Sequence, residues 1–163
     1  MVLERDGGRA NTNRGTGRAV AWLAKQVELG LGDAELSLAQ YRVLGLLCEG
    51  SAVSSAVAER LAVRPPSVTA VIDGLEARGL VDRRTMAGDR RAVALVVTAE
   101  GRRVLAKADD AVDARLADIA GFLGDDDRGA HALEELGRWP TALRAHHQAH
   151  HQARSDPGHE ARP

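Results

Sequence analysis

Aromatic residues, cysteines and long apolar runs are all scarce in this chain of 163 residues. Its only aromatic residues of the Phe/Trp/Tyr type are Trp22, Tyr41, Phe122 and Trp139, so we expect a core of aliphatic side chains. The single Cys48 excludes a disulfide framework within the chain. No run approaches the roughly 18 apolar residues of a membrane span, and no signal-peptide pattern is present. These absences predict a soluble, cytoplasmic protein of one domain.

Charge is distributed unevenly along the chain, although its net value is −1. Residues 53–103 contain nine arginines against six acidic residues, whereas residues 104–143 contain four basic residues against nine acidic ones. A basic middle and an acidic back half are typical of a protein that presents one face to a polyanion. We find no Ser/His/Asp set, no phosphate-binding glycine loop and no credible pair of carboxylates, so we do not expect an enzyme.

The basic segment has the pattern of two short helices joined by a turn. We expect Ser54 to cap the first helix and the Pro65-Pro66 pair to lie in the turn or in the first turn of the second helix. Apolar residues at three- and four-residue spacing predict a second helix over 66–79, ended by Gly79. Its outer face is small and polar, as in a DNA-reading helix-turn-helix, although an ordinary helical hairpin fits the two helices equally well.

A two-stranded ribbon is expected next, and it favours the DNA-binding interpretation. Two runs rich in β-branched and aliphatic residues, 80–85 and 92–97, flank a Gly-Asp turn signal. Arg90 and Arg91 are adjacent at the tip, where an arginine can enter a minor groove. Asp89 could hold one of the two guanidinium groups in a fixed direction. Helix, turn, helix and ribbon in this order predict a winged helix-turn-helix.

The same residues resemble a known family. The segment AGDRRAVALVVTAEGRRVL is similar to the wing signature of the multiple-antibiotic-resistance regulator (MarR) family, which reads Asp-x-Arg, a strand, then Leu-Thr-x-x-Gly. The segment PSVTAVIDGLEARGLV resembles the recognition helix and first wing strand of that family. The resemblance covers about residues 20–145. The matching residues are Asp89, Arg91, Thr98 and Gly101, and Val97 replaces the usual leucine.

The resemblance implies a mainly α (α+β) fold, a winged helix-turn-helix with long N- and C-terminal dimerisation helices. It also implies a sequence-specific DNA-binding regulator, most often a repressor. Ala70 and Gly74 stand where many relatives carry long polar side chains, and Arg64 replaces the usual Ser/Thr cap. Val93-Ala94 likewise replace commonly basic positions. We therefore expect a larger share of phosphate contact and shape readout.

The candidate DNA-binding residues follow from this arrangement. The first turn of the second helix is expected in the major groove and the wing arginines in the minor groove, with further basic and hydroxyl side chains near phosphates. The full set is Ser54, Ser55, Arg64, Pro66, Ser67, Thr69, Ala70, Asp73, Arg83, Arg84, Asp89, Arg90 and Arg91.

Long helices are expected on both sides of the winged segment. We expect Ser37 and Thr98 to cap the helices that follow them, Asp125–Asp127 to begin the last helix, and Pro140 to kink or restart it. Two long C-terminal helices need a cover for their apolar faces, and a C2 homodimer reading a pseudo-palindromic duplex supplies one. The expected divisions are a disordered arm (1–15), a dimerisation helix (16–36), the DNA-binding lobe (37–97), C-terminal dimerisation helices (98–147) and a disordered tail (148–163).

Candidate effector and metal residues complete the sequence-based interpretation. No cofactor is required, but relatives release DNA when a small aromatic acid binds between the dimerisation helices and the lobe, which makes Trp22, Tyr41 and Leu44 candidate ligand contacts. Cys48 is interpreted as a small hydrophobe rather than a redox sensor. The i, i+4 spacing of four histidines allows Zn²⁺ or Ni²⁺ binding, or simply a solvated helix end. A zinc-responsive regulator and a dimeric adaptor that does not bind DNA therefore remain alternatives. The histidines are His146, His147, His150 and His151.

Overall fold

The computed structural model describes residues 15–86 and 89–155, with the backbone alone for Met86, 89–92, Asp126 and 151–155. The predicted N-terminal arm, apart from Gly15, and residues 156–163 therefore lie outside the described residues. In chain order the elements are α2 (Thr16–Leu31), η1 (Gly32–Ala34), α3 (Leu38–Cys48), α4 (Ser54–Arg60), α5 (Pro65–Ala77), β1 (Val81–Met86), β2 (Asp89–Val97), α6 (Ala99–Ala120), η2 (Gly121–Leu123) and α7 (Asp126–Ser155).

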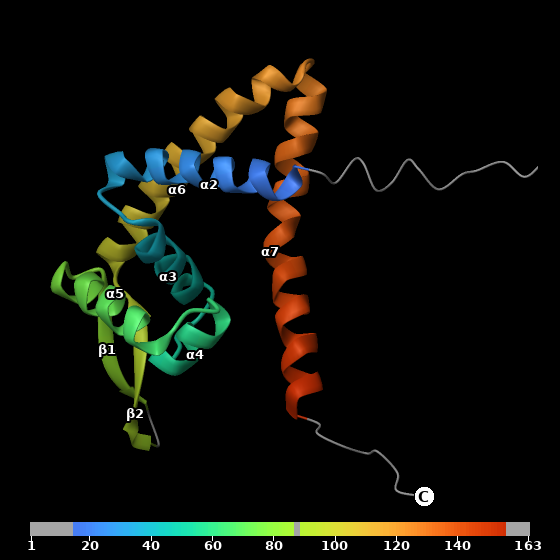
Figure 1. The fold of residues 1–163 in the computed structure, drawn as a ribbon. Coiled ribbons are helices and arrows are strands. Elements are labelled where there is room, and N and C mark those ends of the chain that lie inside the picture. Colours follow the sequence, from blue (N-terminus) through green and yellow to red (C-terminus); the bar gives the residue numbers. More distant parts are fainter. Residues whose placement is uncertain (1–14, 87–88, 156–163) are drawn as a thin grey trace, which may run out of the picture.

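The elements form a lobe and a set of long helices around it (Figure 1). The lobe contains α3, α4, α5 and the antiparallel ribbon of β1 and β2, which projects beyond the helices. Helix α6 leads away from the base of the ribbon, and α2 lies across α6. Helix α7 turns back and runs beside the lobe. The predicted fold, a mainly α winged helix-turn-helix between long terminal helices, is confirmed.

The core is aliphatic and has α3 at its centre. Val43, Leu44 and Leu47 of α3 are at most 4% exposed, and the helix contacts α2, α5, α6 and β2. Ile72 and Leu75 of α5 are fully buried in the same cluster. Among the described residues no Phe, Trp or Tyr side chain is fully buried, which confirms the expectation drawn from their scarcity. Burial of α3 between two layers follows from its apolar residues on more than one face.

Local capping sets the helix boundaries. Ser37 and Gln40 form a reciprocal capping box, in which the Gln40 N–H donates to the Ser37 hydroxyl oxygen at 3.2 Å. The prediction that Ser54 caps α4 is wrong: Val53 is the N-cap, without a side-chain bond, and Ser54 is the first helical residue. Gly79 adopts a φ of +68° just after α5, as predicted, because glycine tolerates the left-handed conformation.

The ribbon is longer than the sequence indicated. β2 begins at Asp89 rather than at residue 92, so the backbone of residues 89–91 belongs to the strand, and the pairing with β1 shifts between Thr85 and Met86. The Leu95 N–H also donates to the Ala52 carbonyl oxygen at 2.9 Å. This additional bridge, which the sequence did not indicate, ties the segment before α4 to the ribbon.

Helix α7 continues past the boundary predicted at residue 147. It runs from Asp126 to Ser155 and includes Pro140, where the prediction allowed a kink or a restart. Residues 148–155, expected to be disordered, are therefore helical. Within the described parts of the chain, no helix combines the length and the apolar character needed to cross a bilayer.

Candidate nucleic-acid interface

Helix α5 presents its polar face at the surface of the lobe. Val68, Ile72 and Leu75 are at most 2% exposed and anchor the helix to the core. The opposite face contains the predicted major-groove residues, and all of them are exposed. They are Pro66, Ser67, Thr69, Ala70 and Asp73. Gly74, in contrast, is partly covered, because a Cβ at this position would lie 3.6 Å from the Gln40 amide nitrogen.

The arginines predicted to contact phosphate differ in whether they already pair with a carboxylate of the protein. Arg83 of β1 binds two carboxylates of α5, that of Asp73 at 2.5 Å and that of Glu76 at 3.3 Å. Arg84 lies 3.4 Å from the Asp82 carboxylate. Arg83 therefore braces the first wing strand against the recognition helix.

Arg64 lies at the N-cap of α5 and is exposed. Its guanidinium group makes no hydrogen bond or ion pair with any described residue. Pro65 occupies the first helical position, where its missing N–H costs no hydrogen bond. Among the described residues nothing therefore competes with an external anion for Arg64, beside the start of the recognition helix.

The predicted contact residues with hydroxyl groups lie at the starts of α4 and α5. The Thr69 hydroxyl donates to the Pro65 carbonyl oxygen at 3.2 Å, which leaves its lone pairs to accept a bond from outside. Ser55 is exposed at the start of α4, and Ser54 is half-buried. The side chains of Asp89, Arg90 and Arg91 lie outside the described residues, and so does the predicted contact between Asp89 and an arginine.

The base of the wing is joined to α6 by Thr98 and Gly101. The Thr98 hydroxyl donates to the Gly79 carbonyl oxygen at 2.8 Å and accepts from the Gly101 N–H at 2.9 Å, which confirms the predicted cap. A Cβ on Gly101 would lie 2.1 Å from the Leu80 carbonyl oxygen. Only glycine allows α6 to start this close to the end of the recognition helix, so the Thr-x-x-Gly motif sets the junction between lobe and long helix.

The three predicted ligand contacts are not brought together. Trp22 is 74% exposed and lines an apolar groove of about 530 Å³ between α2, α6 and α7. Leu44 is fully buried in the core. The Tyr41 hydroxyl donates to the Asp109 carboxylate at 2.6 Å, and burial, followed by this hydrogen bond, raises the pKa of Tyr41 well above its ordinary value. Tyr41 therefore connects α3 to α6.

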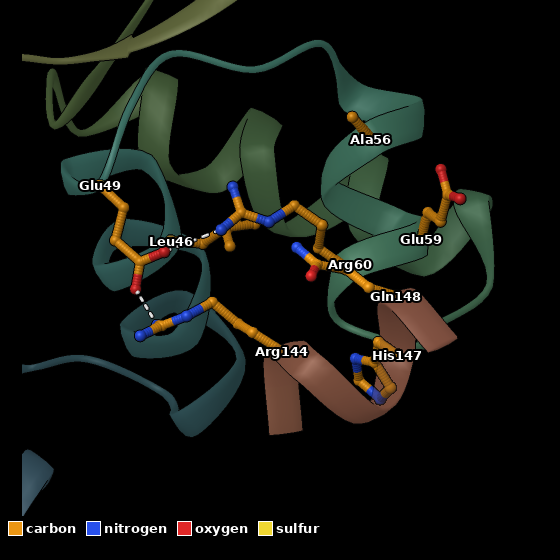
Figure 2. Close-up of a pocket in the computed structure, with 8 residues that line it drawn as sticks. All are labelled: Leu46, Glu49, Ala56, Glu59, Arg60, Arg144, His147 and Gln148. Atoms are coloured by element: carbon orange, nitrogen blue, oxygen red, sulfur yellow. Dashed lines mark hydrogen bonds and ion pairs between the residues drawn. The ribbon is translucent and has the colours of Figure 1, made fainter. Parts of the chain in front are cut away.

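A second cavity, of about 450 Å³, lies between α7 and the lobe (Figure 2). Glu49 at the end of α3 accepts a hydrogen bond from Arg60 of α4 and another from Arg144 of α7, each at 2.8 Å. The sequence carries no signal for these contacts, because Glu49 and Arg144 are 95 positions apart and belong to no motif.

Cys48 and the histidines are also placed by the structure. Cys48 is exposed, so its predicted packing as a small hydrophobe is wrong, although the residues that partly cover it raise the pKa of its thiol and disfavour the thiolate. The His146 and His150 rings lie 4.3 Å apart between centroids. Among the described residues, no group of three or more His, Cys, Asp or Glu side chains could hold a metal ion. The side chain of His151 lies outside the described residues.

Comparisons with known proteins agree with this architecture. Residues 34–92 match the model of the MarR family. The transcriptional regulator FarR of Neisseria gonorrhoeae is 31% identical over 116 residues, which cover 71% of this chain and 80% of FarR. The repressor CouR, in a structure bound to a 23-mer DNA duplex, shares 31% identity with a TM-score of 0.64, over 83% of this chain and 97% of CouR. NadR bound to 4-hydroxyphenylacetate shares 28% identity with a TM-score of 0.60, over 85% of this chain and 98% of NadR.

The fold and its exposed helix define a winged helix-turn-helix protein of the DNA-binding class. The length and identity of the match to FarR show which family within this class the chain belongs to. The chain belongs to the MarR family of transcriptional regulators.

Proposed function

We propose that this protein is a homodimeric repressor that binds a pseudo-palindromic DNA site and is released by a small effector. The observation that carries the proposal is the exposed polar face of α5, with the projecting ribbon beside it. Arg64, which pairs with no described residue, lies at the N-terminal end of this helix. A helix N-terminus with a free cation fits a phosphate, and the following residues then face the base edges. CouR, a similar repressor, has been solved on a DNA duplex.

Readout of the site is assigned to two elements. Ser67 and Thr69 are small and exposed, so they can approach base edges and sugars closely in the major groove. Arg90 or Arg91 enters the adjacent minor groove from the ribbon tip. Arg83 acts mainly as a brace, because its charge is already shared with Asp73 and Glu76.

The dimer follows from apolar surface left uncovered on the long helices. Trp22 of α2, Phe122 of η2 and Trp139 of α7 are each more than half exposed. Leu123 and Leu143 are also about half exposed. A monomer rarely leaves such a set in water, and a C2 interface covers it on both copies at once. The same symmetry places two α5 helices on successive half-sites of one duplex.

The effector is proposed to be a small organic acid, because NadR was solved with 4-hydroxyphenylacetate. A ligand releases DNA only if it binds more tightly to the arrangement of lobes that fits DNA poorly. The histidines of α7 are an alternative zinc-binding element, but the described residues offer no group of three or more His, Cys, Asp or Glu ligands.

The direct test is a fluorescence-anisotropy titration of duplex DNA from the region upstream of the protein's own gene, at several salt concentrations. We expect tight binding to one duplex, with affinity falling as salt rises. Arg64→Ala should reduce the slope of log affinity against log salt by about 2, because each of two half-sites loses a contact worth about 0.9. Arg91→Ala should weaken binding and its preference for A·T-rich flanks.

Arg128→Ala is the matched control, since Arg128 is exposed in the first turn of α7, at the end of that helix far from the ribbon. It should leave affinity and salt slope unchanged. Equal, weak binding to all duplexes, with identical slopes for wild type and Arg64→Ala, would contradict the specific-regulator proposal.

A further inference from the structure

The cavity between α7 and the lobe joins two parts of the molecule through a single carboxylate. Figure 2 shows Arg60, from α4, and Arg144, from α7, both directed toward Glu49 at the end of α3. The two oxygens of Glu49 each accept one bond: Oε2 accepts from Arg60 and Oε1 accepts from Arg144, both at 2.8 Å. Arg144 is held in this direction by a second hydrogen bond, to the Thr141 hydroxyl at 3.0 Å.

In this arrangement two guanidinium groups hold one of the protein's own carboxylates. Two guanidinium groups on one carboxylate form charge-assisted hydrogen bonds with a defined geometry. The Glu49 and Arg144 side chains are each 45% exposed, so Glu49 can rotate into water at little cost. A carboxylate from outside would then find the same donors already in place.

The rest of the cavity suits a small ligand with an apolar part. Its volume, about 450 Å³, lies within the range of small-molecule sites. Leu46 and Ala56 supply apolar wall, and His147 lines the α7 side. The Glu59 carboxylate also lines the cavity. The group to be replaced, the Glu49 carboxylate, brings a single negative charge to the two guanidinium groups, so a monocarboxylate matches it.

We propose that this cavity binds a small monocarboxylate, whose carboxylate replaces Glu49 on Arg60 and Arg144. The inference rests on the proposed function, because it assigns the effector of that regulator a site. The residues differ from Trp22, Tyr41 and Leu44, and the site is built from the end of α3, from α4 and from the C-terminal half of α7. Exchange breaks the link between Arg144 and Glu49, and α4 packs against α5, so the recognition helix receives the change.

Calorimetric titration of the full chain, without DNA, tests the exchange with benzoate as the probe and benzamide as its neutral analogue. We expect benzoate to bind at least about tenfold more tightly than benzamide, because only benzoate forms charge-assisted bonds. Arg144→Gln should weaken benzoate binding by about tenfold. Arg138→Gln is the matched control, since Arg138 lies on the same helix and is paired with Glu134 and Glu135. It should bind benzoate as the wild type does.

Glu49→Gln separates exchange from simple surface attraction. Removing the internal competitor should strengthen benzoate binding by about threefold, the opposite of what loss of a structural contact would cause. Three results would each overturn the proposal: no benzoate binding at about 10 mM, equal binding of benzoate and benzamide, or unchanged benzoate affinity in both Arg144→Gln and Glu49→Gln. The unfolding temperatures of all variants are compared with that of Arg138→Gln to confirm folding.

Failure of this inference is distinguishable from failure of the proposed function. Ligand-free anisotropy titration with duplex DNA tests the regulator alone, whereas calorimetry without DNA tests the cavity alone. Specific DNA binding together with any of the three overturning results would remove the cavity assignment and leave the regulator standing. Benzoate binding without any specific DNA binding would support the cavity as a binding site and remove the regulator proposal.

Discussion

Replacement of Gly101 by alanine is the most direct test of the junction between the wing and α6. A Cβ at this position would lie 2.1 Å from the Leu80 carbonyl oxygen and 2.8 Å from a Val97 methyl group. The carbonyl belongs to the backbone and also accepts the Thr98 N–H at 3.1 Å, so it cannot rotate away. The first turn of α6 must therefore move away from β1 and the end of α5.

A second glycine, Gly45, is the reference for the expected loss of stability. Gly45 lies inside α3, and a Cβ there would meet no atom within 4 Å. Both replacements gain up to about 1 kcal/mol of helix propensity, but only Gly101→Ala incurs overpacking, which costs about 1–3 kcal/mol. The free energy of unfolding of Gly101→Ala should thus lie about 1–3 kcal/mol below that of Gly45→Ala.

Urea unfolding at one fixed protein concentration measures this difference, because the stability of a dimer depends on concentration. Gly101→Ala should also weaken DNA binding in the anisotropy assay, since the angle between α6 and the recognition helix changes. Gly45→Ala should leave DNA affinity unchanged. Equal stability of the two variants would refute the argument that close approach to Leu80 requires glycine.

Three further predictions test other contacts. Tyr41→Phe removes the hydrogen bond to Asp109 and should lower the free energy of unfolding by about 1–2 kcal/mol, measured by urea titration. Folding raises the pKa of Tyr41, so the neutral phenol is favoured in the folded state. Wild-type stability should therefore fall above about pH 10 by more than that of the variant. Parallel plots of unfolding free energy against pH for the two proteins would contradict this. Arg83→Gln leaves Asp73 free to repel phosphates and should weaken DNA binding by at least about tenfold, with partial recovery when Asp73→Asn is added; no recovery in anisotropy titration would exclude the brace. Trp139→Glu should raise the dimer dissociation constant at least about tenfold in sedimentation equilibrium, and an unchanged constant would show that the face of Trp139 is not the interface.

Local sequence patterns are sufficient to predict the order of the elements and the position of the recognition helix. Apolar spacing at Val68, Ile72 and Leu75 is a local signal, because a helix repeats every 3.6 residues whatever surrounds it. Gly79 and Thr98 were equally readable, since a left-handed turn and an N-cap depend on neighbours a few residues away. Helix ends have a weaker local signal, as Ser54 shows, because Val53 begins α4 without a side-chain cap.

Contacts between charged residues that are distant in the sequence depend on how whole elements pack. The sequence predicts Arg83 as a phosphate contact, yet packing of β1 against α5 brings it to Asp73, ten positions earlier in the chain, and makes it a brace. Glu49 and Arg144 had no motif, because their meeting depends on α7 turning back beside the lobe. The local spacing of apolar residues determines which face of a helix is apolar. Contacts between residues far apart in the sequence depend on how complete elements pack, and short sequence patterns carry no information about that packing.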